Sequence, residues 1–260
     1  LGETLRALAS EGRDGFYRGV VAQKLLDGAQ SDGGVWSAKD LADYRIIERE
    51  PLVGTYKEVT IVSAPPPSAG GVGLINMFNM LTGFDLPVAD RVTRTHLLAE
   101  IMRRAFRDRT QYLGDPDFID IPLAMLLHPF YAAGQRANLR IDQATPSTSL
   151  QGIQPANTAN GNQTSHFSVL DMDGNIVAAT QSINFSYGSG YMAPGTGVLL
   201  NNEMDDFSKK PGVSNGYQLL GSAANSIQPG KRMLSSMTPT ILKTNDGVAI
   251  LGSPGGSQII

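Results

Sequence analysis

Residues 164–184 read TSHFSVLDMDGNIVAATQSIN, and this stretch decides the fold. Two strand-like runs, 166–170 and 176–184, flank a turn at 171–175 that contains an Asp-Gly pair, which is a strong signal for a β-hairpin. Residues 141–163, directly before the hairpin, are mostly Ser, Thr, Pro, Asn, Gln and Gly, as is typical of an exposed linker. The sequence therefore predicts that a strand starts where a polar linker ends, with Thr164 at the junction.

The chain before this junction differs in expected structure from the chain after it. Before it, apolar residues recur at helical spacing, and one strand is expected at 56–64, ended by three prolines that cannot donate to a sheet. Two or three short helices are expected within 2–45, with Ser37 and Asp40 as a capping box. A further helix is expected at 72–78, and the longest one at 93–112. After the junction only strands are expected, at 166–170, 176–184, 197–200, 239–244 and 248–252.

Composition excludes several classes of function. The 260 residues include 21 Lys and Arg against 24 Asp and Glu, so a net charge of −3 supplies no basic field for nucleic acid or anionic lipid. The absence of cysteine excludes disulfides, cysteine-bound zinc and thiol catalysis. No apolar run reaches the roughly 18 residues that a membrane helix requires. We therefore expect neither a nucleic-acid partner nor a membrane span in this segment.

Common catalytic motifs are also missing. The sequence has no GxSxG elbow, no Walker A loop and no HExxH helix, and its three histidines lie far apart. Structural roles are therefore expected for the histidines, with a Ser-His-Asp hydrolase as a minor alternative. Asp205 and Asp206 are adjacent, but nothing supplies the further ligands that a metal needs. We expect no metal and no cofactor.

The position of Thr164 suits an N-terminal nucleophile. A hydroxyl nucleophile needs a base, and cleavage before Thr164 would free an α-amine on the same residue that can take the proton. Such an amine has a pKa of about 7.7 to 8, which suits a base at neutral pH. On position alone, an ordinary threonine at the start of a strand is the competing interpretation.

Six motifs extend the argument over the whole chain, and with them the sequence resembles the γ-glutamyltranspeptidase family. They are 65–71 (PPPSAGG), 112–118 (YLGDPDF), 164–169 (TSHFSV), 199–207 (LLNNEMDDF), 234–240 (LSSMTPT) and 252–257 (GSPGGS). The resemblance implies an α+β fold of the N-terminal nucleophile (Ntn) hydrolase type, an αββα four-layer sandwich that is incomplete at both ends of this chain. It also implies a precursor that cleaves itself into a large and a small subunit. Residues 1–163 would be the mostly helical C-terminal part of the large subunit, and 164–260 the β-rich, catalytic first part of the small one.

The resemblance assigns the catalytic residues. Thr164 corresponds to the nucleophile, and Gln163 to the residue before the scissile bond. Ser182 stands where many members have Thr, whose hydroxyl supports the nucleophile; the methyl that restricts χ1 is lost. Gly255 and Gly256 correspond to the oxyanion hole, where backbone amides approach closely because glycine has no Cβ.

The resemblance also assigns the binding residues. Asn184, Glu203 and Asp206 correspond to positions that hold the α-amino group of the γ-glutamyl moiety, and many bacterial members carry Gln in place of Glu203. Ser235 and Ser236 correspond to the pair that binds the α-carboxylate. Oxygen acceptors suit an ammonium, and hydroxyl donors suit a carboxylate.

Residues 211–222 resemble a lid over the pocket, with Tyr217 as its aromatic residue, although a plain surface loop fits the same composition. The family's arginine for the α-carboxylate falls outside this sequence, so the segment alone is expected to bind weakly or to be inactive.

The resemblance implies γ-glutamyl transfer and hydrolysis. The expected partners are a small γ-glutamyl donor such as glutathione and an acceptor that is an amino acid, a peptide or water. A periplasmic or secreted location is implied by the family alone. Two alternatives remain open: a related acylase acting on a glutaryl β-lactam or on poly-γ-glutamate, and a non-catalytic scaffold with the same fold.

Overall fold

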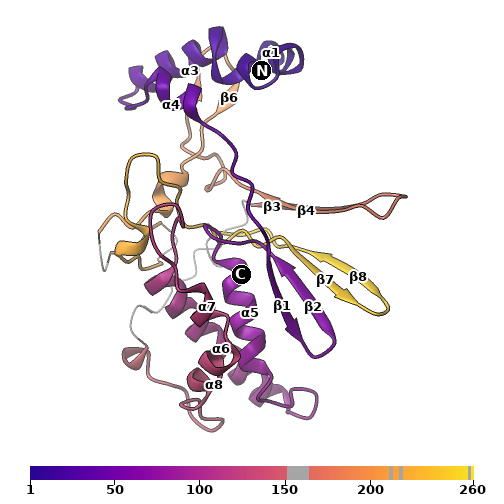
Figure 1. Ribbon diagram of the computed structural model, residues 1–260. Coiled ribbons are helices and arrows are strands. Elements are labelled where there is room, and N and C mark those ends of the chain that lie inside the picture. The colour runs from indigo at the N-terminus through magenta and orange to yellow at the C-terminus, as the bar shows by residue number, and fades with distance from the viewer. Residues whose placement is uncertain (151–163, 211–212, 217–218, 257–258) are drawn as a thin grey trace. The chain divides into compact units, whose positions relative to one another are not determined.

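The computed structural model describes residues 1–150, 164–210, 213–216, 219–256 and 259–260 (Figure 1). The chain forms two compact units, one of Leu1–Arg49 with Ile183–Asn202 and one of Glu50–Ser182 with Glu203–Ile260. This division differs from the expected boundary between 163 and 164. That boundary concerns a covalent cleavage, not compactness, and it stays a prediction.

The first unit is mainly helical. Its elements are α1 (Gly2–Glu11), α2 (Asp14–Tyr17), α3 (Gly19–Ser31), α4 (Ala38–Asp43) and the short antiparallel strands β5 (Met192–Ala193) and β6 (Val198–Leu199). The predicted capping box is confirmed: the Ser37 hydroxyl accepts from the Asp40 amide, and the Asp40 carboxylate accepts from the Ser37 amide. Val21 and Leu25 of α3 pack with Ala193 in the core of this unit.

The second unit is built on an antiparallel sheet. Its strand order is β1 (Leu52–Tyr56), β2 (Val59–Ser63), β7 (Thr240–Thr244) and β8 (Gly247–Leu251). The single strand expected at 56–64 is wrong at its start, because the chain turns at Lys57 with a positive φ of 53° and forms the β1–β2 hairpin. The strands expected at 239–244 and 248–252 are confirmed to within one residue.

Helices cover one side of this sheet. They are α5 (Gly70–Leu81), α6 (Arg91–Tyr112), α7 (Leu123–Leu126) and α8 (Pro129–Arg136), and α5 contacts β1 and β2 as well as the other three helices. In Figure 1, α5 lies between the sheet and the pair α6 and α8. The core here includes Met80, Ile101 and Ala132. Among the described helices, none is long and apolar enough to cross a membrane.

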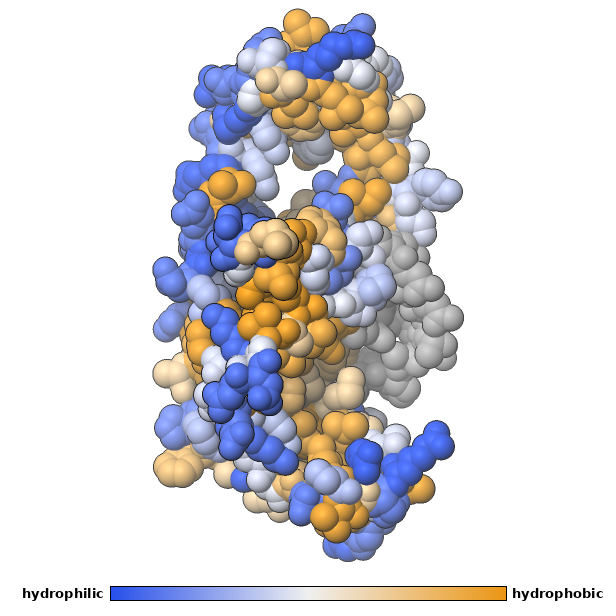
Figure 2. Space-filling model, turned by 90° about the vertical axis from the view of Figure 1, so that its right-hand side faces the viewer, coloured by the Kyte–Doolittle hydropathy of each residue, from blue (hydrophilic) through white to orange (hydrophobic). Residues whose placement is uncertain are grey.

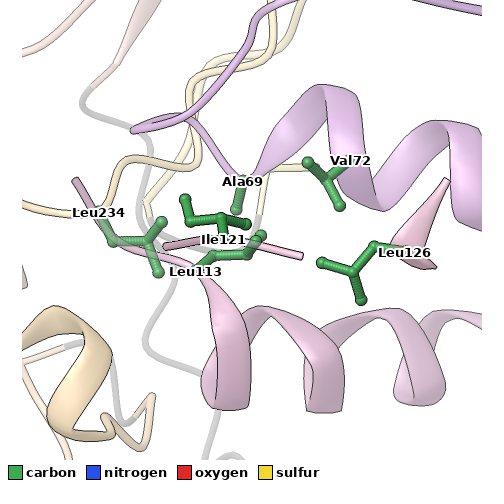
Figure 3. Close-up of a cluster of buried hydrophobic side chains, with 6 residues drawn as sticks. All are labelled: Ala69, Val72, Leu113, Ile121, Leu126 and Leu234. Atoms are coloured by element: carbon green, nitrogen blue, oxygen red, sulfur yellow. The ribbon is translucent and has the colours of Figure 1, made fainter. Parts of the chain in front are cut away.

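A second buried cluster joins the start of α5, the end of α6, α7 and the strand-like segment that carries Leu234 (Figure 3). Its members are Ala69, Val72, Leu113, Ile121, Leu126 and Leu234. Fully burying a leucine contributes about 1.5 to 3 kcal/mol to folding. Leu234 therefore anchors the segment that continues into Ser235 and Ser236.

The predicted hairpin is confirmed as β3 (Ser165–Leu170) and β4 (Ile176–Gln181), in the register Ser165 opposite Gln181. The Asp171 carboxylate accepts from the amides of Asp173 and Asn175 and so closes the turn. β4 ends three residues before the expected position 184, because the chain enters the first unit at Ile183. Phe167, Val169, Leu170 and Val177 are exposed. Figure 2 views the molecule from the side toward which this hairpin projects in Figure 1.

Candidate active site

The Thr164 side chain is buried and lies against two other predicted catalytic residues. Only 6% of the residue is exposed, although it directly precedes β3. Its Oγ1 donates a hydrogen bond to the carbonyl oxygen of Gly255 and lies 3.3 Å from the Oγ of Ser182. The β3–β4 register explains the second contact, because Thr164 and Ser182 each lie one residue beyond the pair Ser165 and Gln181. The structure thus brings together Thr164, Ser182 and Gly255.

Side chains on the hairpin bring the Gly255 segment to Thr164. His166 on β3 is hydrogen-bonded to the Thr180 hydroxyl at 2.7 Å and to the Ser168 hydroxyl at 3.1 Å, and Ser168 donates to the carbonyl of Ile250 on β8 at 3.1 Å. A Cβ at Gly252 would lie 1.9 Å from His166 Nδ1, so only glycine permits this close approach. The expected structural role of His166 is to join the hairpin to β8.

Gly255 itself is buried and has a φ of 140°, in the region that favours glycine. The described contact of Gly255 with Thr164 uses its carbonyl, whereas the predicted oxyanion role uses the amides of Gly255 and Gly256. Gly256 is half-buried. The amide role of the two glycines stays a prediction.

The two predicted carboxylate-binding serines are held by the proline-rich segment before α5. The Ser235 amide donates to the Pro67 carbonyl at 2.9 Å, and the Ala69 amide donates to the Ser235 carbonyl at 2.8 Å. A Cβ at Gly70 would lie 1.9 Å from the Thr238 hydroxyl oxygen, so this approach also requires glycine. The 65–71 and 234–240 motifs therefore form one structural feature.

Arg109 is a buried cation beside this feature, and the sequence reasoning missed it. Its Nη2 lies 3.3 Å from the Ser236 Oγ, to which it donates. Burial lowers the pKa of Arg109 to about 10, while the negative charge of Asp206 opposes the lowering. The guanidinium thus stays charged at neutral pH. A signal was available: Arg109 follows Leu97, Ile101 and Ala105 at four-residue spacing, which places a cation on the buried face of α6.

Asp206 ends the 3₁₀ helix η2 (Glu203–Asp206), which also contains Glu203. One Asp206 carboxylate oxygen accepts from the Asn215 side-chain amide at 3.2 Å. Asp205 is held by other groups: it pairs with Lys209 at 2.6 Å and accepts from the Gly216 amide at 2.7 Å. Within the described ranges, no group of three or more His, Asp or Glu side chains is arranged to hold a metal.

The remaining predicted residues are placed as follows. Asn184 belongs to the first unit, where it is buried, has a φ of 72° and donates through Nδ2 to the Asn202 carbonyl at 3.0 Å. Gln163 and Tyr217 lie outside the described residues. Their roles at the cleavage site and in a lid stay predictions.

Comparison with known proteins identifies the family. The family described as Gamma-glutamyltranspeptidase matches residues 1–260. The chain is 42% identical over 269 residues to the glutathione hydrolase proenzyme of Escherichia coli strain K12, covering 100% of this chain and 45% of that protein. The chain thus spans about half the length of the curated relatives it matches.

Solved structures agree with this family assignment. The structure of a cephalosporin acylase from Bacillus halodurans is similar with a TM-score of 0.74 at 26% identity, over 97% of this chain and 42% of that chain. The γ-glutamyltranspeptidase of Helicobacter pylori is similar with a TM-score of 0.55 at 35% identity, over 57% of this chain and 43% of that chain. The mixed α+β architecture described above is therefore part of the Ntn hydrolase fold.

Proposed function

Because the chain belongs to the γ-glutamyltranspeptidase family, we propose that it carries the catalytic junction of an enzyme that hydrolyses and transfers γ-glutamyl groups, with glutathione and related compounds as donors. The observation that carries this proposal is the buried Thr164 hydroxyl between Ser182 and Gly255. It is the arrangement expected of a nucleophile whose hydroxyl is oriented before the reaction. The complete fold is proposed to be the four-layer αββα sandwich.

The first reaction is maturation of the precursor. Thr164 Oγ1 attacks the carbonyl carbon of Gln163, and the peptide C–N bond breaks as an ester to Oγ1 forms. Water then hydrolyses this ester, which leaves a carboxylate on Gln163 and an α-amine on Thr164. The products are the proposed large and small subunits, divided between residues 163 and 164.

The second reaction uses the freed amine as base. The Thr164 hydroxyl gives its proton to the amine and attacks the γ-carbonyl of the donor, and the leaving amine departs with that proton. An acyl-enzyme ester remains on Oγ1. Water resolves it to glutamate, and an amino acid or peptide amine resolves it to a new γ-glutamyl compound. Ser182 holds the hydroxyl in position, and the amides of Gly255 and Gly256 are proposed to stabilise the oxyanion.

The binding residues suit a zwitterionic donor. Asp206, Glu203 and Asn184 are proposed to hold the α-ammonium, and Ser235 and Ser236 the α-carboxylate. The buried guanidinium of Arg109 supports the carboxylate end, because it donates to Ser236. Tyr217 is proposed to belong to a lid over the donor. The proposed reaction uses no cofactor and no metal. A periplasmic or secreted location is proposed from membership of the family.

A second candidate function is that of the acylases. It is supported by the similarity to the cephalosporin acylase of Bacillus halodurans, which extends over 97% of this chain with a TM-score of 0.74. The two candidates differ in the α-amino group. A donor without it should react poorly if Asp206 and Glu203 bind an ammonium, and well if the protein is an acylase.

The test is the denatured intact mass of the complete gene product, together with glutamate release from glutathione. We expect two polypeptides divided before Thr164 and release of glutamate, and we expect Thr164→Ala to give one uncleaved chain and no release. Thr164→Ser is the matched control, because it keeps a hydroxyl nucleophile. A single uncleaved wild-type chain that binds glutamate without turnover would instead support the scaffold alternative.

A further inference from the structure

Asn225 links the two halves of the proposed donor site through one side chain. It ends the 3₁₀ helix η3 (Ala223–Asn225) and only 6% of it is exposed. Its Nδ2 donates to the backbone carbonyl of Asp206 at 2.7 Å, and its Oδ1 accepts from the backbone amide of Leu234 at 3.0 Å. Asp206 is proposed to bind the ammonium, and Leu234 directly precedes Ser235. The donor and the acceptor of one side-chain amide therefore each form a hydrogen bond with a different half of the site.

The backbone at Asn225 is held by contacts on several sides. Its own carbonyl accepts from the Ser208 amide at 2.8 Å, two residues beyond Asp206. The preceding carbonyl, that of Ala224, accepts from the buried Lys231 ammonium at 2.9 Å. A Cβ at Gly114 would lie 2.4 Å from this same carbonyl oxygen, so the segment directly after α6 packs closely against η3. These contacts define where the backbone that carries the Asn225 side chain lies.

We infer that Asn225 is a positioning residue that fixes the spacing between the Asp206 segment and the Ser235–Ser236 segment, and thereby selects donors that are α-amino acids. This inference rests on the proposed function. The ammonium and the carboxylate of an α-amino acid lie on one carbon, so the groups that bind them must hold a fixed separation. Binding constellations must hold their geometry to within about 0.5 Å, which requires side chains of this kind behind the contacts.

Two substitutions distinguish the hydrogen bond donated by Asn225 Nδ2 from the one accepted by its Oδ1. Asn225→Asp keeps the shape and the acceptor for the Leu234 amide, but it replaces the donor to the Asp206 carbonyl with a second acceptor. Asn225→Ala removes both hydrogen bonds. The matched control is Asn79→Ala, since Asn79 on α5 also donates through Nδ2 to a backbone carbonyl, that of Leu127 at 3.0 Å, and its described hydrogen bonds involve none of the site segments.

The experiment measures kcat/KM of the complete gene product with three chromogenic anilides. They are γ-glutamyl anilide, glutaryl anilide, which lacks the α-ammonium, and 4-aminobutanoyl anilide, which lacks the α-carboxylate. The ratios between donors are the readout. A variant that is only less stable has less active enzyme, which lowers all three values equally and leaves the ratios unchanged.

In Asn225→Asp we expect the preference for γ-glutamyl over glutaryl anilide to fall about ten-fold, with a smaller loss against 4-aminobutanoyl anilide. In Asn225→Ala both preferences should fall by about ten-fold or more, and in Asn79→Ala neither should change.

Wild-type ratios in both Asn225 variants, with turnover intact, would overturn the role of Asn225 and leave the proposed function standing. A wild-type protein that does not release the anilide from γ-glutamyl anilide would overturn the proposed function, and the role of Asn225 with it.

Discussion

The Oγ of Ser182 lies 3.3 Å from the Oγ1 of Thr164, across the open end of a hairpin whose two strands place them opposite each other. Removing this hydroxyl in Ser182→Ala leaves Thr164 with the Gly255 carbonyl as its described partner. A hydrogen bond contributes about 1 kcal/mol net, so we expect about a five-fold loss in the rates of cleavage and of γ-glutamyl turnover. Stopped time courses of precursor cleavage, followed by mass, measure the first rate.

Ser182→Thr is the control for this prediction. It keeps the hydroxyl and adds the methyl that restricts χ1, so we expect at least wild-type rates. Equal losses in Ser182→Ala and Ser182→Thr would contradict the role of the hydroxyl and would point to crowding at this position.

Gly252 is predicted to be required for the position of the Gly255 segment. In Gly252→Ala the new Cβ would meet the His166 ring at 1.9 Å, so the ring and the Gly252 backbone must move apart. Overpacking of this kind costs about 1 to 3 kcal/mol, and the movement should also slow cleavage before Thr164. Urea unfolding and cleavage rate measure the two effects.

Gly134→Ala is the matched control, since no atom lies within 4 Å of its Cβ position on α8. It should be neutral or stabilising by about 0.5 to 1 kcal/mol, because alanine is the better helix former. If Gly252→Ala and Gly134→Ala had the same effects on stability and cleavage rate, the close approach at Gly252 would not be needed for the position of the Gly255 segment.

The hairpin at 164–184 and the long helix at 91–112 could be predicted because each depends on a pattern within one segment. The Asp-Gly turn and the four-residue apolar spacing are local signals. The strand expected at 56–64 is wrong at its start for the same reason: Tyr56 to Ser63 reads as one β-rich run, and the turn at Lys57 contains no glycine, proline or asparagine to mark it.

The contacts that hold the site residues in place could not be predicted from patterns within one segment. The motifs predicted which residues carry chemistry, but the partners that hold them come from distant segments: Pro67 for Ser235, and Asn225 for both Asp206 and Leu234. Such contacts depend on how segments pack. A single sequence does not say which distant segments pack together, so these contacts could not be predicted from it.

Arg109 is predicted to control binding of the donor. Its guanidinium is fully buried, donates to Ser236 and lies in the field of Asp206. Arg109→Met would remove the charged donor to Ser236 and leave Asp206 with less positive charge nearby, and a hydrogen bond that involves a charged group contributes about 1.5 to 3 kcal/mol. We expect lower stability in urea unfolding and a KM for γ-glutamyl anilide raised by about ten-fold or more.

Arg109→Lys distinguishes charge from geometry. Lysine keeps the charge but loses the planar fork, so stability should recover more than KM does. A normal KM in Arg109→Met would show that the cation serves folding alone.

Glu100 should make stability depend on pH in the acid range. The carboxylate is 2% exposed, and although burial raises its pKa, hydrogen bonds from Thr145, Arg104 and Arg103 outweigh this and lower the pKa from 4.5 to about 2. Because the folded pKa lies below the unfolded one, the stabilisation is complete above about pH 4.5 and is lost as the pH falls toward 2. A shift of this size corresponds to about 3 kcal/mol.

The measurement is the free energy of unfolding in urea at several pH values for wild type and Glu100→Gln. The difference between them should be largest near pH 6 and should shrink by about 3 kcal/mol on approach to pH 2. Asp142→Asn is the control, because Asp142 and its partner Arg140 are exposed and screened by water, so its pH profile should follow wild type. A constant difference between wild type and Glu100→Gln across this range would mean that Glu100 is stabilised by its packing and not by its charge.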